Sequence, residues 1–552
     1  MPSHRNALHG LASVGAVAAG VLAQGERRAV KKHVILHPFL FAIFPALFLY
    51  LHNIGELWLA QLAAPLAIVT ASSLILWLLL RLILRDQIRA AVLSSLWWVW
   101  FFSWGYVRPL GRVLVFASTG ESDRAPVFLA IYFILLLCLA GLALTRRRGL
   151  GTLSSALNVA AVALVGWQVV AIANCEVGRA RAHRSMRRRA SIAAPRARPA
   201  RALPNIYYII LDGYARADVL KDLYQYDNSE FLAYLARRGF SVARRGRANY
   251  CQTLLSLASS LNLEYLDELA KPLRSSSDRN SLMTMIQDNR LCKFLRERGY
   301  RVIAFPSGFG GTELRRADMF VEGAAGLNEF QSALLDTTPV PLLVRQRSAE
   351  MLMDPLSSGA RIHYAFDHLP ETAKLTPPVL VFAHIVCPHP PFVFDGEGHE
   401  LPSQRPFPLG DGSHFSGTRE EYVAAYREQL IFVNREVETT IAAILGQSKW
   451  PTVIILQSDH GPGSRLDWKS AARTDQRERL GALIAVRLPE GQRAEIDDDL
   501  SPVNIFRILL SRYFDAKLDV LPNECFYSTW ERPYDFTRVT DKVEPEMVDS
   551  LR

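Results

Sequence analysis

The chain has 552 residues and a net charge of +10, and half of its residues are hydrophobic, so more than one structural unit is expected. The positive charge is unevenly distributed: residues 1–173 carry 14 basic against 5 acidic residues, 174–204 carry 9 against 1, and 205–552 carry 40 against 47. Because the polar C-terminal part is net negative, this distribution argues against nucleic-acid binding and favours contact with lipid head groups.

The N-terminal part contains apolar segments of the length that a helix needs to cross about 30 Å of hydrocarbon. We expect a bundle of about five transmembrane helices within residues 33–173, at 34–52, 58–80, 90–107, 126–144 and 153–173. Residues 1–32 are predicted to be a cytoplasmic N-terminal segment.

Basic residues predict the orientation of this bundle. Arg27, Arg28, Lys31 and Lys32 precede the first segment, and Arg146–Arg148 precede the last. Because cytoplasmic loops carry an excess of Lys and Arg, the N-terminus is expected inside and the C-terminal domain outside the cell (inner) membrane, on the periplasmic or extracellular side. Nine arginines between Arg179 and Arg201 oppose this orientation; we interpret residues 174–204 as an exposed basic Arg/Pro-rich linker.

Strand-like and helix-like segments alternate from residue 205 onward. Apolar runs predict buried strands, and Asn228, the Thr418–Glu421 capping box and Ser501-Pro502 predict helix starts. The strands are expected at 205–211, 301–305, 379–384 and 452–457. This alternation predicts an α/β domain over residues 205–535, with a largely parallel central sheet and a C-terminal tail at 536–552.

Polar residues follow three of these strands. Asp212-Gly213 follows the first, Ser458-Asp459-His460-Gly461 follows the last, and His384 to His389-Pro390-Pro391 ends the third. Because parallel strands present their carboxyl ends at one edge of a sheet, these side chains are expected to converge on a cation. Each residue alone is also consistent with a turn or cap aspartate, or with a structural histidine.

Together these motifs resemble the sulfatase-like branch of the alkaline phosphatase superfamily. The resemblance covers about 205–530 and is strongest to membrane-anchored members: lipoteichoic acid synthases, phosphoglycerol transferases and phosphoethanolamine transferases. It depends on Asp212-Gly, Asn249-Tyr-Cys-Gln-Thr253-Leu-Leu-Ser256, His384-x4-His389-Pro-Pro-Phe392, Ser458-Asp459-His460-Gly461, Ser501-Pro502 and Leu521-Pro-Asn. It implies a sulfatase/alkaline-phosphatase-like fold for the C-terminal domain.

The resemblance also implies roles for individual residues. Thr253 would be the nucleophile and a metal ligand at a helix N-terminus, where the macrodipole favours an anion. Asp212, Asp459 and His460 would complete the site of one divalent metal ion, Mn, Mg or Zn. His384 and His389 would contact the substrate phosphate or protonate the leaving group. The alternative for Thr253 is an ordinary N-cap threonine.

Two departures from family patterns narrow the activity. The segment Cys251-Gln-Thr-Leu-Leu lacks the Pro and Arg of a classical sulfatase, so arylsulfatase activity is disfavoured. No Asp-x-x-x-His ligand set for a second metal is evident. The six cysteines show no zinc spacing, and a disulfide among the four in the C-terminal domain is left open.

Three functional hypotheses follow. The first is a transferase that moves a phosphoryl head group, phosphoglycerol or phosphoethanolamine, from a membrane phospholipid through Thr253 to a glycan or lipid acceptor. The second is a hydrolase with the same site, a phosphodiesterase or a sulfuric-ester hydrolase. The third is a non-enzymatic membrane protein with a degenerate domain, which predicts an incomplete ligand set.

Overall fold

The computed structural model describes residues 34–54, 57–115, 125–145, 149–186, 192, 203–321, 329–345, 358–376, 378–401, 410–489 and 496–544. The predicted N-terminal segment 1–32, about half of the predicted linker and the end of the predicted tail lie outside these residues. The chain divides into two compact units, one with Met1–Phe44, Ile68–Trp100 and Ala130–Gly166, and one with Pro45–Ala67, Phe101–Leu129 and Trp167–Arg552.

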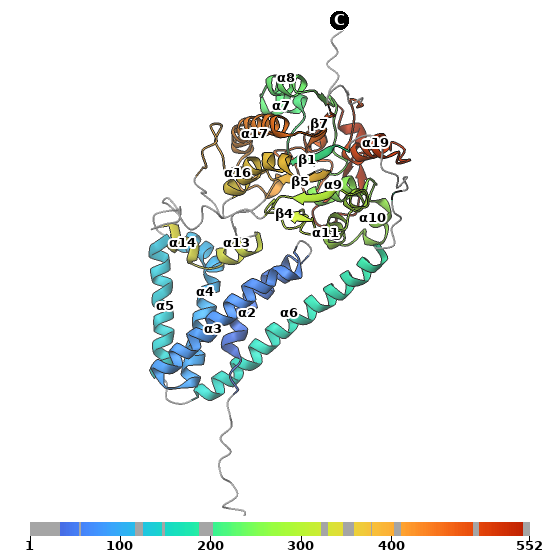
Figure 1. The fold of residues 1–552 in the computed structure, drawn as a ribbon. Coiled ribbons are helices and arrows are strands. Elements are labelled where there is room, and N and C mark those ends of the chain that lie inside the picture. Colours follow the sequence, from blue (N-terminus) through green and yellow to red (C-terminus); the bar gives the residue numbers. More distant parts are fainter. Residues whose placement is uncertain are drawn as a thin grey trace, which may run out of the picture. The chain divides into compact units, whose positions relative to one another are not determined.

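All five predicted apolar helices are present (Figure 1). They are α2 (His37–His52), α3 (Ala63–Leu84), α4 (Gln87–Val115), α5 (Ala125–Thr145) and α6 (Leu150–Met186). Four helical segments, Leu59–Leu84, Gln87–Arg108, Val127–Thr145 and Leu150–Val177, are long and apolar enough to cross a membrane, whereas α2 has only 16 residues. Helix α6 also continues to Met186, into the segment predicted to be linker.

A buried histidine joins three helices of the first unit. His37 Nδ1 lies 2.6 Å from Ser95 Oγ, and its Nε2 lies 3.0 Å from Ser154 Oγ. Asn158 Oδ1 accepts a hydrogen bond from the His37 amide at 2.9 Å. Because an unpaired polar group is costly in an apolar bundle, these contacts specify how α2, α4 and α6 pack.

The C-terminal domain is built on a seven-stranded sheet in the order β2-β7-β6-β1-β5-β3-β4. Strands β6, β1, β5, β3 and β4 are mutually parallel, and β7 is antiparallel to both of its neighbours. The bounds are β1 (Asn205–Leu211), β2 (Phe240–Val242), β3 (Arg301–Ala304), β4 (Met319–Phe320), β5 (Val379–Ile385), β6 (Thr452–Gln457) and β7 (Ile484–Arg487). The predicted α/β fold with a largely parallel sheet is therefore confirmed.

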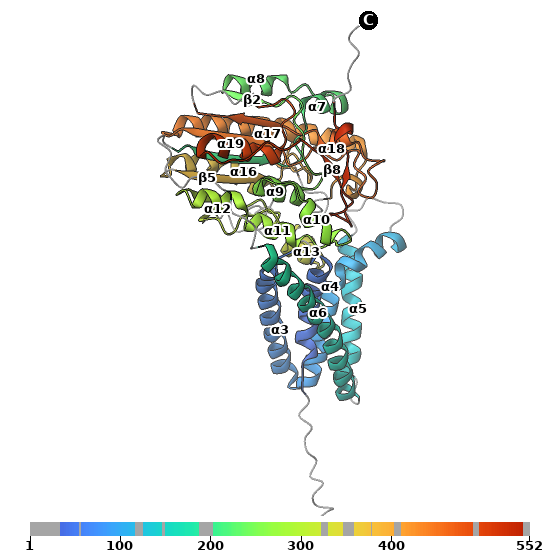
Figure 2. The same cartoon turned by 90° about the vertical axis from the view of Figure 1, so that its right-hand side faces the viewer.

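Strand β1 lies at the centre of the domain and is buried on both faces. Its side chains alternate: Tyr208 and its even-numbered neighbours pack into one apolar cluster, and Tyr207 and its odd-numbered neighbours pack into the other. Helices α9 (Thr253–Asn262), α11 (Asn280–Gln287), α12 (Arg290–Arg296) and α19 (Pro502–Phe514) cover the first face. Helices α7 (Ala217–Tyr224), α8 (Ser229–Arg237), α16 (Ser358–His368) and α17 (Arg419–Gln447) cover the second (Figures 1 and 2).

The predicted helix starts are present, but only one is capped as expected. Thr418 Oγ1 accepts a hydrogen bond from the Glu421 amide, and the Glu421 carboxylate accepts one from the Thr418 amide, which completes the capping box of α17. The Asn228 side chain instead contacts Tyr214 and Asn434, so tertiary contacts replace the predicted cap of α8. Ser501 Oγ likewise donates to Asn523 Oδ1.

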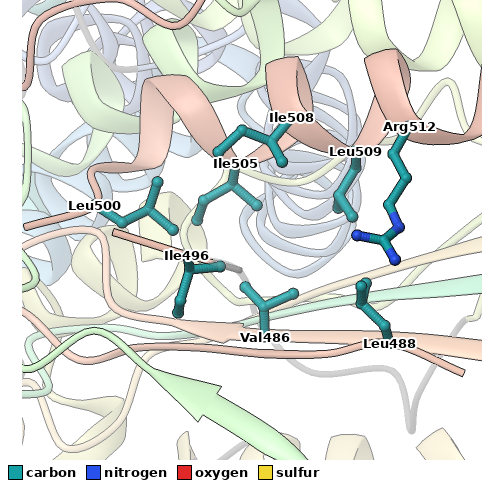
Figure 3. Close-up of a pocket in the computed structure, with 8 residues that line it drawn as sticks. All are labelled: Val486, Leu488, Ile496, Leu500, Ile505, Ile508, Leu509 and Arg512. Atoms are coloured by element: carbon teal, nitrogen blue, oxygen red, sulfur yellow. The ribbon is translucent and has the colours of Figure 1, made fainter. Parts of the chain in front are cut away.

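An apolar pocket lies between β7 and α19 (Figure 3). Side chains of α19 and of β7 point toward each other across it. Its lining residues are Val486, Leu488, Ile496, Leu500, Ile505, Ile508, Leu509 and Arg512. None of them offers a nucleophile or a metal ligand, so we do not place the active site there.

The central sheet makes a quantitative prediction about stability. Ile455 in β6 is fully buried, so Ile455→Ala is expected to lower the free energy of unfolding by about 2–5 kcal/mol through lost burial and a residual cavity. Val520→Ala, at a 54% exposed position, is the control and is expected to change it by less than about 0.5 kcal/mol. Chemical denaturation of the full-length protein checks this; equal midpoints for the two variants would contradict the packing.

Candidate active site

The strand order brings three sequence-distant segments to one edge of the sheet. Strand β1 lies between β5 and β6, so the residues that follow these strands are neighbours. The Asp212 amide donates to the Ile385 carbonyl at 3.0 Å, and the Gly213 amide donates to Asp459 Oδ1 at 3.3 Å. These main-chain contacts fix both aspartates where the strands end.

Gly213 lets the chain turn immediately after Asp212. Its φ of +74° lies in the left-handed region, where a side chain is strained. A Cβ at this position would also lie 3.5 Å from the Cα of His389, whose amide donates to the Asp212 carbonyl at 3.0 Å. The turn therefore allows the His389 segment to pack against the end of β1.

Asp212, Asp459 and His460 form a buried cluster of potential metal ligands. One ligand atom from each lies within 4.8 Å of the others. Asp212 Oδ1 and Asp459 Oδ2 are buried and have no hydrogen-bond partner among the described residues, which is costly for a carboxylate unless a cation neutralises it.

His460 presents its lone pair to these carboxylates. Its Nδ1 lies 2.9 Å from the Gly461 carbonyl, so Nδ1 carries the hydrogen in the neutral ring and Nε2 is free to bind a metal. Burial, and then the nearby Arg479 guanidinium, lower the pKa of His460, which favours the neutral form. Nε2 lies 3.2 Å from Asp459 Oδ2 and 3.6 Å from Asp212 Oδ1.

Asp212 is held in its ionised form. Burial opposes ionisation, but the positive potential of His389, the hydrogen bond with His384 and the proximity of His460 outweigh it and hold the pKa of Asp212 below its usual range. Two carboxylates and a neutral imidazole nitrogen therefore fit one divalent cation, and this donor set suits Mn, Mg and Zn alike.

Thr253 lies at the edge of this cluster as the first residue of α9. Its half-buried Oγ1 is 3.0 Å from His460 Nε2, the same nitrogen that faces the carboxylates. One turn later, Ser256 Oγ donates to the Asp459 carbonyl at 2.7 Å and fixes the helix to the end of β6. The hydroxyl of Thr253 is thus placed at a helix N-terminus, next to the candidate metal site.

The two histidines of the His384-x4-His389 motif have different surroundings. His384 is 1% exposed, and both ring nitrogens have partners: Nε2 is 3.1 Å from Asp212 Oδ2 and Nδ1 is 2.8 Å from Thr312 Oγ1. Both ring nitrogens of His384 therefore have protein partners, one of which is Asp212, and the expected contact of His384 with substrate stays a prediction.

His389 has one nitrogen without a close acceptor among the described residues. Its Nδ1 is 2.6 Å from the Pro390 carbonyl, whereas Nε2 lies 3.6 Å from Asp411 Oδ2. Burial lowers the pKa of His389, but the negative charges of Asp212 and Asp411 outweigh burial and raise it. His389 is therefore the better of the two histidines for donating a proton.

Sequence reasoning missed two charged residues of the site. Asp411 and Arg479 form a buried ion pair with Nη1 2.5 Å from Oδ2, and Arg479 Nη2 lies 3.1 Å from His460 Nε2. Arg479 belongs to α18 (Gln476–Leu480), whose charged sequence is typical of a solvated helix. No sequence signal could have distinguished its role from that of the other charged residues of α18.

The cysteines do not form the disulfide that the sequence left open. All six are free thiols, and the four in the C-terminal domain are buried. Cys251, two residues before Thr253, lies 3.3 Å from the Ser528 amide nitrogen, and burial raises the pKa of its thiol. Cys251 is therefore a packing residue rather than a reactive one.

Comparison with known proteins finds no matching family model and no matching curated protein. Among solved structures, the chain is similar to the periplasmic domain of EcEptC from Escherichia coli in complex with Zn, at 12% identity and a TM-score of 0.42, covering 65% of this chain and 98% of that one. It is also similar to the integral membrane protein lipooligosaccharide phosphoethanolamine transferase A from Neisseria meningitidis, at 13% identity and a TM-score of 0.38, covering 86% and 94%.

A 2-O GAG sulfatase matches at 14% identity and a TM-score of 0.38, covering 58% of this chain and 72% of that one. Because the identities and TM-scores are low, we base the functional proposal on this chain's own residues.

The ligand cluster predicts how metal binding responds to substitution. Asp459→Asn is expected to weaken Zn²⁺ and Mn²⁺ binding by about 100-fold or more, because a neutral amide replaces a buried anionic ligand. Asp498→Asn, which removes a surface carboxylate paired with Arg244, is expected to leave the affinity unchanged. Isothermal titration of the full-length protein measures both. Equal affinities for the two variants would exclude Asp459 as a ligand.

A buried glutamate next to Arg479 makes stability depend on pH. Glu478 accepts hydrogen bonds from Tyr224, Ser464 and the Arg465 amide, yet burial outweighs these donors and raises its pKa to about 7. A raised pKa means that the folded state binds the proton more tightly than the unfolded state. The stabilisation is therefore complete below about pH 4.5 and is lost as the pH rises through about 7.

Glu478→Gln is expected to remove this pH dependence. Between pH 4.5 and 8 the wild type should lose up to about 3 kcal/mol relative to the variant, because the unfolded carboxyl ionises earlier than the buried one. Thermal unfolding across this range measures the difference, with exposed Glu420→Gln as the control. Parallel pH profiles for the wild type and Glu478→Gln would contradict the shifted pKa.

Proposed function

We propose that the chain is a metal-dependent transferase that moves a phosphoryl head group from a membrane phospholipid to a glycan or lipid acceptor, with Thr253 as the nucleophile. The observation that carries this proposal is the placement of Thr253 Oγ1 at a helix N-terminus, 3.0 Å from the His460 nitrogen that faces two buried carboxylates. A threonine hydroxyl is a weak nucleophile, and the helix N-terminus together with a bound cation would favour its alkoxide.

Asp212, Asp459, His460 and Thr253 would hold the divalent cation. When bound, the ion would supply charge neutralisation for the phosphate ester and would lower the pKa of the Thr253 hydroxyl. One oxygen of each buried carboxylate has no hydrogen-bond donor among the described residues, and this supports the assignment. His384 would keep Asp212 in place through its 3.1 Å contact.

The first half-reaction forms the Oγ1–phosphorus bond on Thr253 and breaks the bond between phosphorus and the diacylglycerol oxygen. The hydroxyl proton of Thr253 leaves to solvent. The diacylglycerol alkoxide takes a proton from His389, whose raised pKa favours the charged imidazolium. The products are diacylglycerol and a head-group phosphodiester on Thr253.

The second half-reaction reverses these roles. A hydroxyl of the acceptor attacks phosphorus and neutral His389 takes its proton. The bond between phosphorus and Thr253 Oγ1 breaks, and Oγ1 takes a proton from solvent. If water takes the place of the acceptor, the same steps give the phosphodiesterase that is the alternative function. A sulfuric ester is a less suitable substrate, because the Thr253 segment lacks the Pro and Arg of the sulfatase pattern.

The helices long enough to cross a membrane support a lipid donor. An anchored domain works close to the bilayer surface, where phospholipid head groups are concentrated. We place the C-terminal domain on the periplasmic or extracellular side of the cell (inner) membrane, as the basic residues between the apolar segments favour. This placement requires that the shorter helix α2 crosses the membrane together with the four longer helices. Phosphoglycerol and phosphoethanolamine are both compatible with this site as the transferred group.

The proposal predicts that Thr253→Ala abolishes head-group transfer. Diacylglycerol release from mixed phosphatidylglycerol and phosphatidylethanolamine vesicles is expected to fall at least about 1,000-fold, because no other hydroxyl replaces the nucleophile. Thr253→Ser should retain partial activity, and exposed Thr418→Ala should be as active as the wild type. Chelation of divalent metal should stop release by the wild type.

The outcomes separate the hypotheses. Release without transfer to an added acceptor identifies a hydrolase. Equal release by Thr253→Ala and the wild type contradicts the nucleophile. Metal binding without release from any lipid or soluble phosphate ester supports the non-enzymatic reading.

A further inference from the structure

Arg479 is a buried guanidinium that is held rigidly on one side. Its Nε donates to the Cys251 carbonyl at 2.9 Å, and Nη1 donates to Asp411 Oδ2 at 2.5 Å and to the Gly461 carbonyl at 3.0 Å. The side chain is 1% exposed, and its central carbon lies 5.2 Å from the centre of the Trp468 ring. These contacts fix the plane of the Arg479 guanidinium group.

The remaining nitrogen, Nη2, shares a neighbour with the proposed nucleophile. It lies 3.1 Å from His460 Nε2, and Thr253 Oγ1 lies 3.0 Å from the same atom. Because both groups are within hydrogen-bond distance of one nitrogen, Nη2 and Oγ1 are at most about 6 Å apart. A phosphoryl group bonded to Oγ1 covers part of that separation, and a hydrogen bond of about 2.9 Å from Nη2 to a non-bridging oxygen can cover the rest.

The lone pair of His460 Nε2 cannot accept a hydrogen bond from Arg479 and bind a metal ion at the same time. The two unpartnered carboxylate oxygens and the His460 tautomer fit a cation that uses this lone pair. Nη2 then requires another acceptor, because a buried N–H group without one costs about 1–3 kcal/mol. An oxygen of a phosphoryl group is the acceptor that a guanidinium pairs with most strongly.

We propose that Arg479 Nη2 donates a hydrogen bond to a non-bridging oxygen of the phosphoryl group that Thr253 receives. This inference rests on the proposed function and deepens it: Arg479 is the specificity-determining contact for a tetrahedral phosphate. Asp411 orients the guanidinium by holding Nη1, so that only Nη2 faces the substrate. The fixed donor stabilises negative charge on the oxygen as the bond to Thr253 forms.

The competing explanation is that Arg479 only holds His460 in place. The two roles differ in what they bind. A residue that positions His460 affects metal affinity, whereas a residue that contacts the phosphoryl oxygen affects phosphate affinity after the metal site is saturated. Arg477 on the same helix offers a matched control, since it pairs with Asp222 and Asp218 instead of facing Thr253.

The test measures binding of inorganic phosphate to the full-length protein in detergent, loaded with saturating Zn²⁺. Arg479→Met is expected to weaken phosphate binding about 10-fold or more, while Arg477→Met changes it by less than about 2-fold. Zn²⁺ affinity, titrated separately, is expected to stay within about 3-fold of the wild type in both variants. Circular dichroism and the thermal midpoint check that each variant is folded.

Two results would overturn the proposal. One is unchanged phosphate affinity in folded Arg479→Met; the other is weaker Zn²⁺ binding with normal phosphate affinity once Zn²⁺ is saturating. If Arg479→Met does not fold, the phosphate affinity of Arg479→Lys decides between the two roles. We expect about a 10-fold loss there too, because one ammonium group cannot contact Asp411 and the phosphate together, and unchanged affinity overturns the contact.

The probe keeps this inference separate from the lipid donor. If phosphate binding depends on Arg479 but no diacylglycerol is released, the phospholipid donor is excluded and the Arg479–phosphoryl contact is supported. If diacylglycerol is released but phosphate binding is independent of Arg479, the Arg479–phosphoryl contact is excluded and the transferase proposal is supported.

Discussion

The constraint on which the site depends is the burial of two carboxylates side by side. Asp212 and Asp459 are at most 2% exposed, and one oxygen of each has no hydrogen-bond donor among the described residues. Two such charges are costly in a protein interior unless positive charge is supplied nearby. His384 contacts one oxygen of Asp212 and stabilises its charge. The other carboxylate oxygens and the neutral His460 nitrogen lie where they fit one divalent cation.

The parallel sheet is what brings the carboxylates together. Strand β1 lies between β5 and β6, so Asp212, His384 and Asp459 leave adjacent strands at one edge although they are far apart in sequence. Helix α9 adds Thr253 from one side, and the buried Asp411–Arg479 pair closes the other. A hydroxyl and a guanidinium thereby meet at a single imidazole nitrogen, His460 Nε2.

The sequence predicted the parts of this arrangement that follow regular patterns. The bounds of β1 and β6 matched the predicted runs, because a strand buried on both faces is continuously apolar and ends abruptly at Asp212 or Ser458. The motifs also indicated which side chains to examine, and the structure brings Asp212, Thr253, Asp459 and His460 together. Their roles, like the domain boundaries, remain predictions. Arg479 could not have been found, because its contacts with Cys251 and Asp411 depend on tertiary packing that no local pattern encodes.

The most direct test of the proposed mechanism is to look for the head-group phosphate bonded to the enzyme. The metal-loaded full-length protein would be quenched with acid during turnover of phospholipid without an acceptor, and its peptides examined by mass spectrometry. With Thr253 as the nucleophile, we expect a phosphoglycerol or phosphoethanolamine adduct on Thr253 that is absent after chelation of the metal. Head-group transfer with no adduct on Thr253, or with the adduct on another residue, would contradict it.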